Sequence, residues 1–249
     1  MYEIEIKSLL GSKERAEELK SRLAEHFPAL KALSPHQQLN HYFTTTTDLS
    51  VFEKAITPFL SAQKQRELSE IVKNVRGGVS IRTREADGAV FVILKASIGD
   101  DSSANGVSRV EFECVIPPVA DNAGDCDTTN VAHTNKSHPR TSATLEKLDK
   151  ILLNAGLSYE AKWSREREEY VAGAIRITID RNAGYGYLAE FEKMIGDERE
   201  ADYARRELKA LMAELGCAEL PQERLERMFA FYNTHWEEYY GTERVFVVE

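Results

Sequence analysis

Glu3-Ile4-Glu5-Ile6-Lys7 stands near the start of the chain, and the rest of the sequence is interpreted from it. Side chains on a β-strand point alternately to opposite faces. The stretch therefore predicts a strand with Glu3, Glu5 and Lys7 on one face and two isoleucines on the other. One such strand is ordinary for the solvated face of a sheet. The pattern becomes informative when it recurs.

The same division into a charged face and an apolar face recurs in six further stretches. Soluble sheets usually scatter neutral polar residues over a wet face, whereas here paired carboxylates and paired bases occupy it. A sheet that closes around these charges, with helices on its apolar outer face, satisfies the pattern. We therefore predict an α+β fold built on an eight-stranded antiparallel β-barrel. The charged-face residues are Arg82 and Arg84, Lys95, Glu111 and Glu113, Arg165 and Arg167, Asp180, and Glu190 and Glu192.

Composition narrows the class of protein. The chain has 249 residues, 42% of them hydrophobic, which is enough for one large domain with a substantial core. Its net charge of −9 argues against a general nucleic-acid or membrane surface. The three cysteines are widely spaced and form no disulfide framework, which favours a reducing compartment. We expect a cytoplasmic protein that is a monomer or a homodimer.

The remaining periodicity predicts helices around a single domain, 1–249. A barrel core is expected over 1–195, followed by C-terminal helices over 196–249 that pack on the barrel. Asp87-Gly88 predicts a hairpin turn. The other expected segments are a helix at 12–26, a strand at 37–45, a helical insert at 48–76, a polar loop at 119–141, a helix at 142–155, strands at 159–171, 174–181 and 186–194, and helices at 200–216 and 222–239.

The two sets of charges point to a chemistry. Arginine contacts phosphate through two parallel N–H groups, and carboxylates bind hard divalent cations such as Mg²⁺ or Mn²⁺. Burying so many charges is not explained by stability alone. The sequence therefore predicts a tunnel for a metal–triphosphate. The expected phosphate-binding bases are Lys7, Arg82, Arg84, Lys95, Arg165 and Arg167, and the expected metal ligands are Glu3, Glu5, Glu111, Glu113, Asp180, Glu190 and Glu192.

In their order and spacing, these motifs resemble the triphosphate tunnel metalloenzymes, also called the CYTH superfamily. Glu3, Glu5 and Lys7 match the N-terminal Glu-x-Glu-x-Lys signature, and the order and spacing of all the motifs together carry the resemblance, which covers about residues 1–195. It implies relatives among class IV adenylate cyclases, thiamine triphosphatases and inorganic triphosphatases. It also implies a catalytic group made of Glu3, Glu5, Lys7 and Asp180.

Three functions remain open at this point. The first is hydrolysis of a small-molecule triphosphate, dependent on Mg²⁺ or Mn²⁺, in which water attacks the terminal phosphorus. The second is a class IV adenylate cyclase reaction, which makes cyclic AMP and pyrophosphate from ATP. The third is a module that binds nucleotides or polyphosphate without turnover. All three use the same tunnel, and the sequence does not select the substrate.

Overall fold

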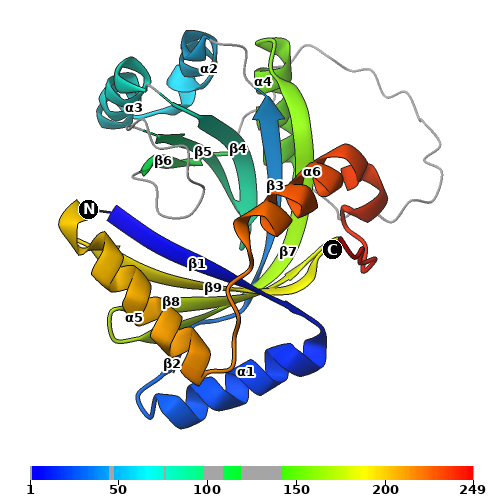
Figure 1. Ribbon diagram of the computed structural model, residues 1–249. Helices are drawn as coiled ribbons and strands as arrows, with labels where there is room; N and C mark the ends of the chain where they lie inside the picture. Colours follow the sequence, from blue (N-terminus) through cyan, green and yellow to red (C-terminus); the bar gives the residue numbers. More distant parts are fainter. Residues whose placement is uncertain (1, 45–47, 76, 98–108, 119–141, 249) are drawn as a thin grey trace.

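The structure is a computed structural model that describes residues 2–44, 48–75, 77–97, 109–118 and 142–248. One antiparallel sheet curls around a central space, and helices cover much of its outer side (Figure 1). The polar loop expected at 119–141 lies outside the described residues.

The strands of the sheet follow the path β1-β9-β8-β7-β3-β4-β5-β6, with antiparallel neighbours throughout. A two-residue strand, β2, pairs with β7 beside this path. The bounds are β1 Tyr2–Gly11, β2 Lys31–Ala32, β3 His36–Thr44, β4 Val79–Ala86, β5 Ala89–Ser97, β6 Arg109–Ile116, β7 Ser158–Ala172, β8 Ile175–Asn182 and β9 Gly186–Ile195.

The α+β class and the antiparallel sheet are confirmed, and two details of the prediction are corrected. With β2, the described residues form nine strands rather than eight. β1 and β6 are the two ends of the path, and no backbone ladder joins them within the described residues, so the sheet is curled but not closed. Alternation in a sequence reports the two faces of a strand. Closure depends on tilt and register, which alternation does not encode.

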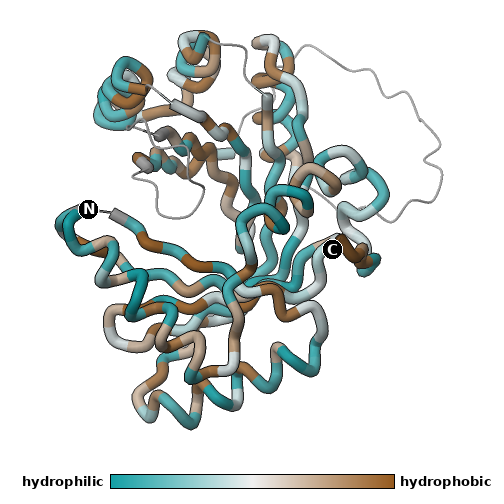
Figure 2. Tube along the Cα trace, viewed as in Figure 1, coloured by the Kyte–Doolittle hydropathy of each residue, from teal (hydrophilic) through white to brown (hydrophobic). Residues whose placement is uncertain are grey.

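Two hydrophobic clusters attach helices to the outer side of the sheet. One packs α1 and α5 against β1, β8 and β9, and the other packs α2, α3 and α4 against β4, β5 and β6. α1 and α5 mix hydrophobic and hydrophilic residues along their length, as such packing requires (Figure 2). No helix within the described ranges is long and apolar enough to cross a membrane. The bounds are α1 Lys13–His26, α2 Leu49–Ile56, α3 Ala62–Asn74, α4 Ala143–Asn154, α5 Ala201–Glu214 and α6 Gln222–Tyr239.

Local sequence signals account for several boundaries. Ser12, Ser61 and Ser142 cap α1, α3 and α4, because each side chain accepts a hydrogen bond from the backbone N–H three residues on. The helical insert breaks at a short 3₁₀ turn, Thr57–Phe59, that contains Pro58, because proline disfavours the interior of a helix. Asp87 and Gly88 have φ of 50° and 77°, and they form the predicted hairpin turn between β4 and β5.

The last helix, α6, does not lie on the outer side of the sheet alone. Its hydrophobic cluster includes Trp163 and Leu188, which have the strand parity of the charged face. Just before α6, the amide of Leu220 donates to the carbonyl of Lys7 at 2.7 Å. The hydroxyl of Tyr232 in α6 donates to the backbone carbonyl of Lys162 in β7. Lys162 precedes the part of β7 that pairs with β8. The prediction of helices on the outer face therefore needs correction for α6, because an amphipathic pattern does not say which surface a helix covers.

Gly184, in the turn between β8 and β9, tests this packing. Its φ is +83°, and an added Cβ would lie 2.7 Å from Tyr232 Cδ2 and 2.8 Å from Phe246 Cε1. Gly88 has a similar φ of +77° with nothing within 4 Å of an added Cβ. We expect Gly184→Ala to lower the free energy of unfolding by about 1–3 kcal/mol more than Gly88→Ala, because only the first substitution overpacks the α6 contact. Urea unfolding of both variants measures the difference, and equal losses would contradict the packing.

Candidate functional site

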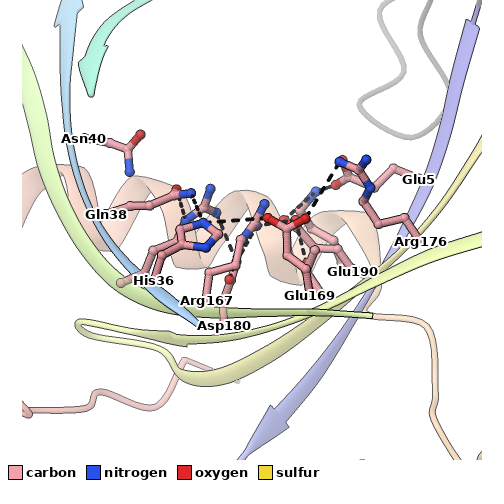
Figure 3. Close-up of polar contacts among 12 residues, drawn as sticks. Glu5, His36, Gln38, Asn40, Arg167, Glu169, Arg176, Asp180 and Glu190 are labelled. Carbon is pink, nitrogen blue, oxygen red and sulfur yellow. Dashed lines mark hydrogen bonds and ion pairs between the residues drawn. The ribbon is translucent and has the colours of Figure 1, made fainter. Parts of the chain in front are cut away.

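The predicted charged residues share one face of the sheet, on the inside of the curl. Residues directly opposite each other in an antiparallel pair point to the same face. Arg167, Asp180 and Glu190 point into the same space as Gln38 and Asn40 of β3 (Figure 3). The cross-strand partners that connect this face are Glu5 with Glu192, Lys7 with Glu190, Asp180 with Arg167, Arg165 with Gln38, Arg84 with Asn40, Arg82 with Tyr42, and Lys95 with Glu111.

A dense ion-pair network surrounds Asp180, which is fully buried. Arg167 donates to both of its oxygens, at 2.7 and 2.6 Å, and Arg165 donates to Oδ2 at 3.0 Å. Arg167 also donates to Glu190 at 2.7 Å, and Lys7 Nζ lies 3.5 Å from that carboxylate. Burial opposes ionisation of Glu190, but Lys7, Arg167 and Arg165 outweigh it and lower its pKa. The network thus fixes two arginines in the middle of the inner face.

Carboxylates crowd one another at the β1–β9 side. Glu192 lies opposite Glu5, and burial followed by the charge of Glu3 raises the pKa of Glu192. A divalent cation relieves this kind of repulsion, and carboxylate oxygens are its preferred donors. The donor type therefore fits Mg²⁺ or Mn²⁺. The side chains form no ready-made site, however, because no group of three or more His, Cys, Asp or Glu within the described residues is arranged to hold a metal.

Three arginines of the inner face are held by neutral oxygen atoms of β3. Gln38, Asn40 and Tyr42 occupy every second position of β3, so their side chains all point to the charged face. Tyr42 and Asn40 lie opposite residues of β4, and Gln38 lies opposite a residue of β7. Asn40 and Gln38 are buried, with 2% and 5% of their surfaces exposed. The three bonds run from Arg82 Nη1 to Tyr42 Oη at 2.8 Å, from Arg84 Nε to Asn40 Oδ1 at 2.9 Å, and from Arg165 Nε to Gln38 Oε1 at 2.8 Å.

Positive charge is in excess around Arg84, which lies close to Arg82 and Arg165. The carboxylates of β6 lie at longer range, with 3.8 Å from Arg82 to Glu111 and 3.5 Å from Arg84 to Glu113. Burial, and then the neighbouring arginines, lower the pKa of Arg84 to about 9. The Nε atom of Arg82 is buried without a hydrogen-bond partner. A site with buried, partly uncompensated guanidinium groups favours an anion.

Tyr42 reports the same electrostatic environment. Burial alone would raise the pKa of its hydroxyl, yet the charges of Arg82, Arg165 and Arg84 outweigh burial and lower it. The guanidinium carbon of Arg82 also lies 5.6 Å from the centroid of the Tyr42 ring.

Sequence reasoning missed several residues on this face. Gln38, Asn40 and Tyr42 were expected on a strand but were given no part in the site, because the predicted site consists of charged residues alone. Glu169 was also missed, and it lies 3.6 Å from His36 and 3.8 Å from Arg176 (Figure 3). The signal was available, since Glu169 shares strand parity with Arg165 and Arg167, and the three β3 residues alternate in the same way.

The inner face is therefore polarised. Arginines with neutral partners gather where β3 meets β4 and β7, and carboxylates gather where β1 meets β9. Lys95 contacts Glu111 at 3.0 Å, and its charge also acts on Glu192, so it lies between the two regions. An anion with several acceptor oxygens, accompanied by a cation, matches both regions at once.

Solved structures resemble the fold over most of its length. A putative adenylate cyclase from Vibrio parahaemolyticus has a TM-score of 0.54 and 16% identity, covering 92% of this chain and 98% of that one. The PH1012 protein from Pyrococcus horikoshii OT3 gives 0.53 and 14%, covering 89% and 92%. The PH1819 protein of the same organism gives 0.52 and 19%, covering 89% and 94%. At these identities the likeness concerns the fold alone.

No curated protein is matched significantly by the sequence. A family model does match: the CYTH domain model covers residues 1–224 and thus includes every strand of the curled sheet and the charged residues on its inner face. The Glu3-x-Glu5-x-Lys7 strand and the curled antiparallel sheet agree with this family model. The chain belongs to the CYTH domain family.

Proposed function

We propose that the protein hydrolyses a triphosphate in a reaction that depends on a divalent cation. The polarised inner face carries the proposal, because it offers closely spaced buried arginines beside a crowded group of carboxylates. The CYTH family includes triphosphatases and class IV adenylate cyclases, and both act on triphosphates. A pure anion-binding site would not need the carboxylates, so turnover is the better explanation of the full set.

Each group of residues takes one part of the reaction. Arg82, Arg84 and Arg165 bind phosphate oxygens, together with Lys95. Glu3, Glu5 and Glu192 hold the cation, assisted by Glu111 and Glu113 across the inner face. The cation, Mg²⁺ or Mn²⁺, supplies charge neutralisation and lowers the pKa of bound water. The rest of the catalysis is positioning and electrostatic stabilisation.

The roles of three residues differ in this proposal from those expected from the sequence. Asp180 was expected among the metal ligands and catalytic residues, but its oxygens accept three hydrogen bonds from Arg165 and Arg167. We assign it the positioning of those arginines. Lys7 contacts Glu5 and lies near Glu190, so it orients carboxylates as well as offering charge to the phosphates. Glu190 is likewise held by Arg167 rather than free for a cation.

A triphosphate panel with Mg²⁺ or Mn²⁺ tests the reaction. Tripolyphosphate, thiamine triphosphate and ATP are incubated with the protein, and the products are separated. Orthophosphate is the expected product from at least one of them. Pyrophosphate with cyclic AMP from ATP would instead identify a class IV adenylate cyclase, and tight binding without any product would identify a binding module.

Ligand length provides an independent prediction. A ligand that binds only the folded protein stabilises it by about 2.7 kcal/mol at a hundredfold excess over its dissociation constant. Tripolyphosphate should raise the melting temperature more than orthophosphate at equal concentration, because only the longer chain reaches Lys95 and the three arginines together. Thermal shift measures both, with Lys13→Ala on α1 as a control outside the inner face. Equal shifts for the two ligands would contradict a site for a phosphate chain.

A further inference from the structure

Strand β3 meets three arginines with one neutral acceptor each. Tyr42 lies directly opposite Arg82, and Asn40 lies directly opposite Arg84. On the other side of β3, Gln38 lies opposite an arginine of β7. Directly opposed side chains in an antiparallel pair are about 4.5–5.5 Å apart at Cβ, so each hydrogen bond is set by the backbone register. The arginines are therefore oriented before any ligand arrives.

Neutral partners distinguish Arg82 and Arg84 from the other bases of the inner face, because their nearest carboxylate oxygens lie 3.8 and 3.5 Å away. Arg165 differs from these two, since it also donates to Asp180 at 3.0 Å. Lys7 contacts a carboxylate, Lys95 contacts Glu111 at 3.0 Å, and Arg167 donates twice to Asp180. A neutral oxygen fixes the direction of a guanidinium group without cancelling its charge. A carboxylate at the same place would do both.

We propose that Gln38, Asn40 and Tyr42 are positioning residues that hold Arg165, Arg84 and Arg82 for a phosphate chain, and that the neutral partners of Arg84 and Arg82 leave the charge of these two arginines available, so that the protein binds polyphosphate without a divalent cation. This inference rests on the proposed function for the identity of the ligand. It adds an order to the reaction, in which the anion binds the arginines and brings or recruits the cation.

A purely structural role for the three β3 side chains predicts a different result for anion binding. If β3 only satisfied buried N–H groups, a better acceptor in place of Asn40 would leave anion binding unchanged. Asn40→Asp keeps the size and the oxygen position but adds a charge next to Arg84, with Arg82 and Arg165 nearby. We expect this variant to melt at a higher temperature than the unmodified protein in the absence of ligand, and yet to bind polyphosphate more weakly.

The experiment measures tripolyphosphate binding by isothermal titration without divalent metal, so that no hydrolysis occurs. Loss of one charge-assisted bond to phosphate corresponds to about a tenfold weaker dissociation constant or more, and that is the change expected for Asn40→Asp. Asn40→Leu, which frees Arg84 without neutralising it, should weaken binding less. Asn154→Asp, the same chemical change on the exposed end of α4, should leave the dissociation constant unchanged.

Tyr42 gives a second readout that needs no ligand. Its hydroxyl faces Arg82 and Arg84 of β4 and Arg165 of β7. Burial raises the pKa of Tyr185 and of Tyr232, and the negative charge of ionised Tyr42 adds to both increases. The difference in absorbance at alkaline pH between the unmodified protein and Tyr42→Phe isolates its ionisation. With Asn40→Asp, that ionisation should move to higher pH.

The outcomes separate this inference from the proposed function. Metal-free binding that is weakened by Asn40→Asp, together with a higher melting temperature, supports the inference whether or not the protein hydrolyses the ligand. Metal-dependent hydrolysis without any metal-free binding overturns the inference and leaves the proposed function standing. Metal-free binding that Asn40→Asp leaves within a factor of two also overturns it.

Discussion

Replacing Asp180 with alanine is expected to lower the free energy of unfolding by about 3 kcal/mol or more. The substitution leaves Arg165 and Arg167 with fewer partners in a site where only 16% and 14% of their side chains are exposed. Removing one member of a buried ion pair typically costs about 3–5 kcal/mol, because the remaining charge is desolvated without compensation. Glu190 still contacts Arg167, which places the expected loss near the lower end of that range.

Chemical denaturation at neutral pH measures this loss. The matched control is Asp197→Ala, since Asp197 also pairs with an arginine, Arg199, but that arginine is 89% exposed. Exposed pairs contribute up to about 1 kcal/mol, so the control should stay within that bound. Tripolyphosphate should restore part of the stability of Asp180→Ala by supplying negative charge to the two arginines. A loss below about 1 kcal/mol for Asp180→Ala would show that the network does not support the fold.

The second large effect concerns the crowded carboxylates. Glu5→Gln and Glu192→Gln are each expected to reduce turnover by about 100-fold or more at ordinary metal concentration. A bound cation supplies several kcal/mol of transition-state stabilisation, and about 3 kcal/mol corresponds to about 100-fold in rate. Steady-state kinetics across a Mg²⁺ series measures the loss. Unchanged activity in both variants would mean that these carboxylates are structural.

Glu192→Gln is expected to lower turnover without lowering the free energy of unfolding. The pKa of Glu192 is raised in the folded protein, so the folded state is favoured when this carboxyl is protonated, and that advantage is lost as the pH rises through the raised pKa. Glutamine is neutral at every pH and avoids the repulsion from Glu3. The metal-free variant should therefore be at least as stable as the unmodified protein at neutral pH, which separates loss of turnover from loss of folding.

The sequence alone determined the faces of the strands. Side chains alternate with a period of two regardless of what surrounds a strand, so Glu3-x-Glu5-x-Lys7 and Arg82-x-Arg84 could be assigned to one face before any contact was known. Local sequence signals likewise determined where helices begin and strands turn. Examples are the helix cap at Ser12 and the hairpin turn at Asp87-Gly88, because both depend on nearby backbone geometry.

Only the tertiary structure decided which partners these residues meet. Gln38 and Arg165 are 127 positions apart, and their bond exists because β3 lies beside β7 in one particular register. Register and curl result from packing of the whole sheet, so no local pattern shows that Arg165 meets both Gln38 and Asp180. The same holds for the positions of β1 and β6 at the two ends of the strand path among the described residues. It also holds for α6, whose apolar side is evident from the sequence while the surface that it covers is not.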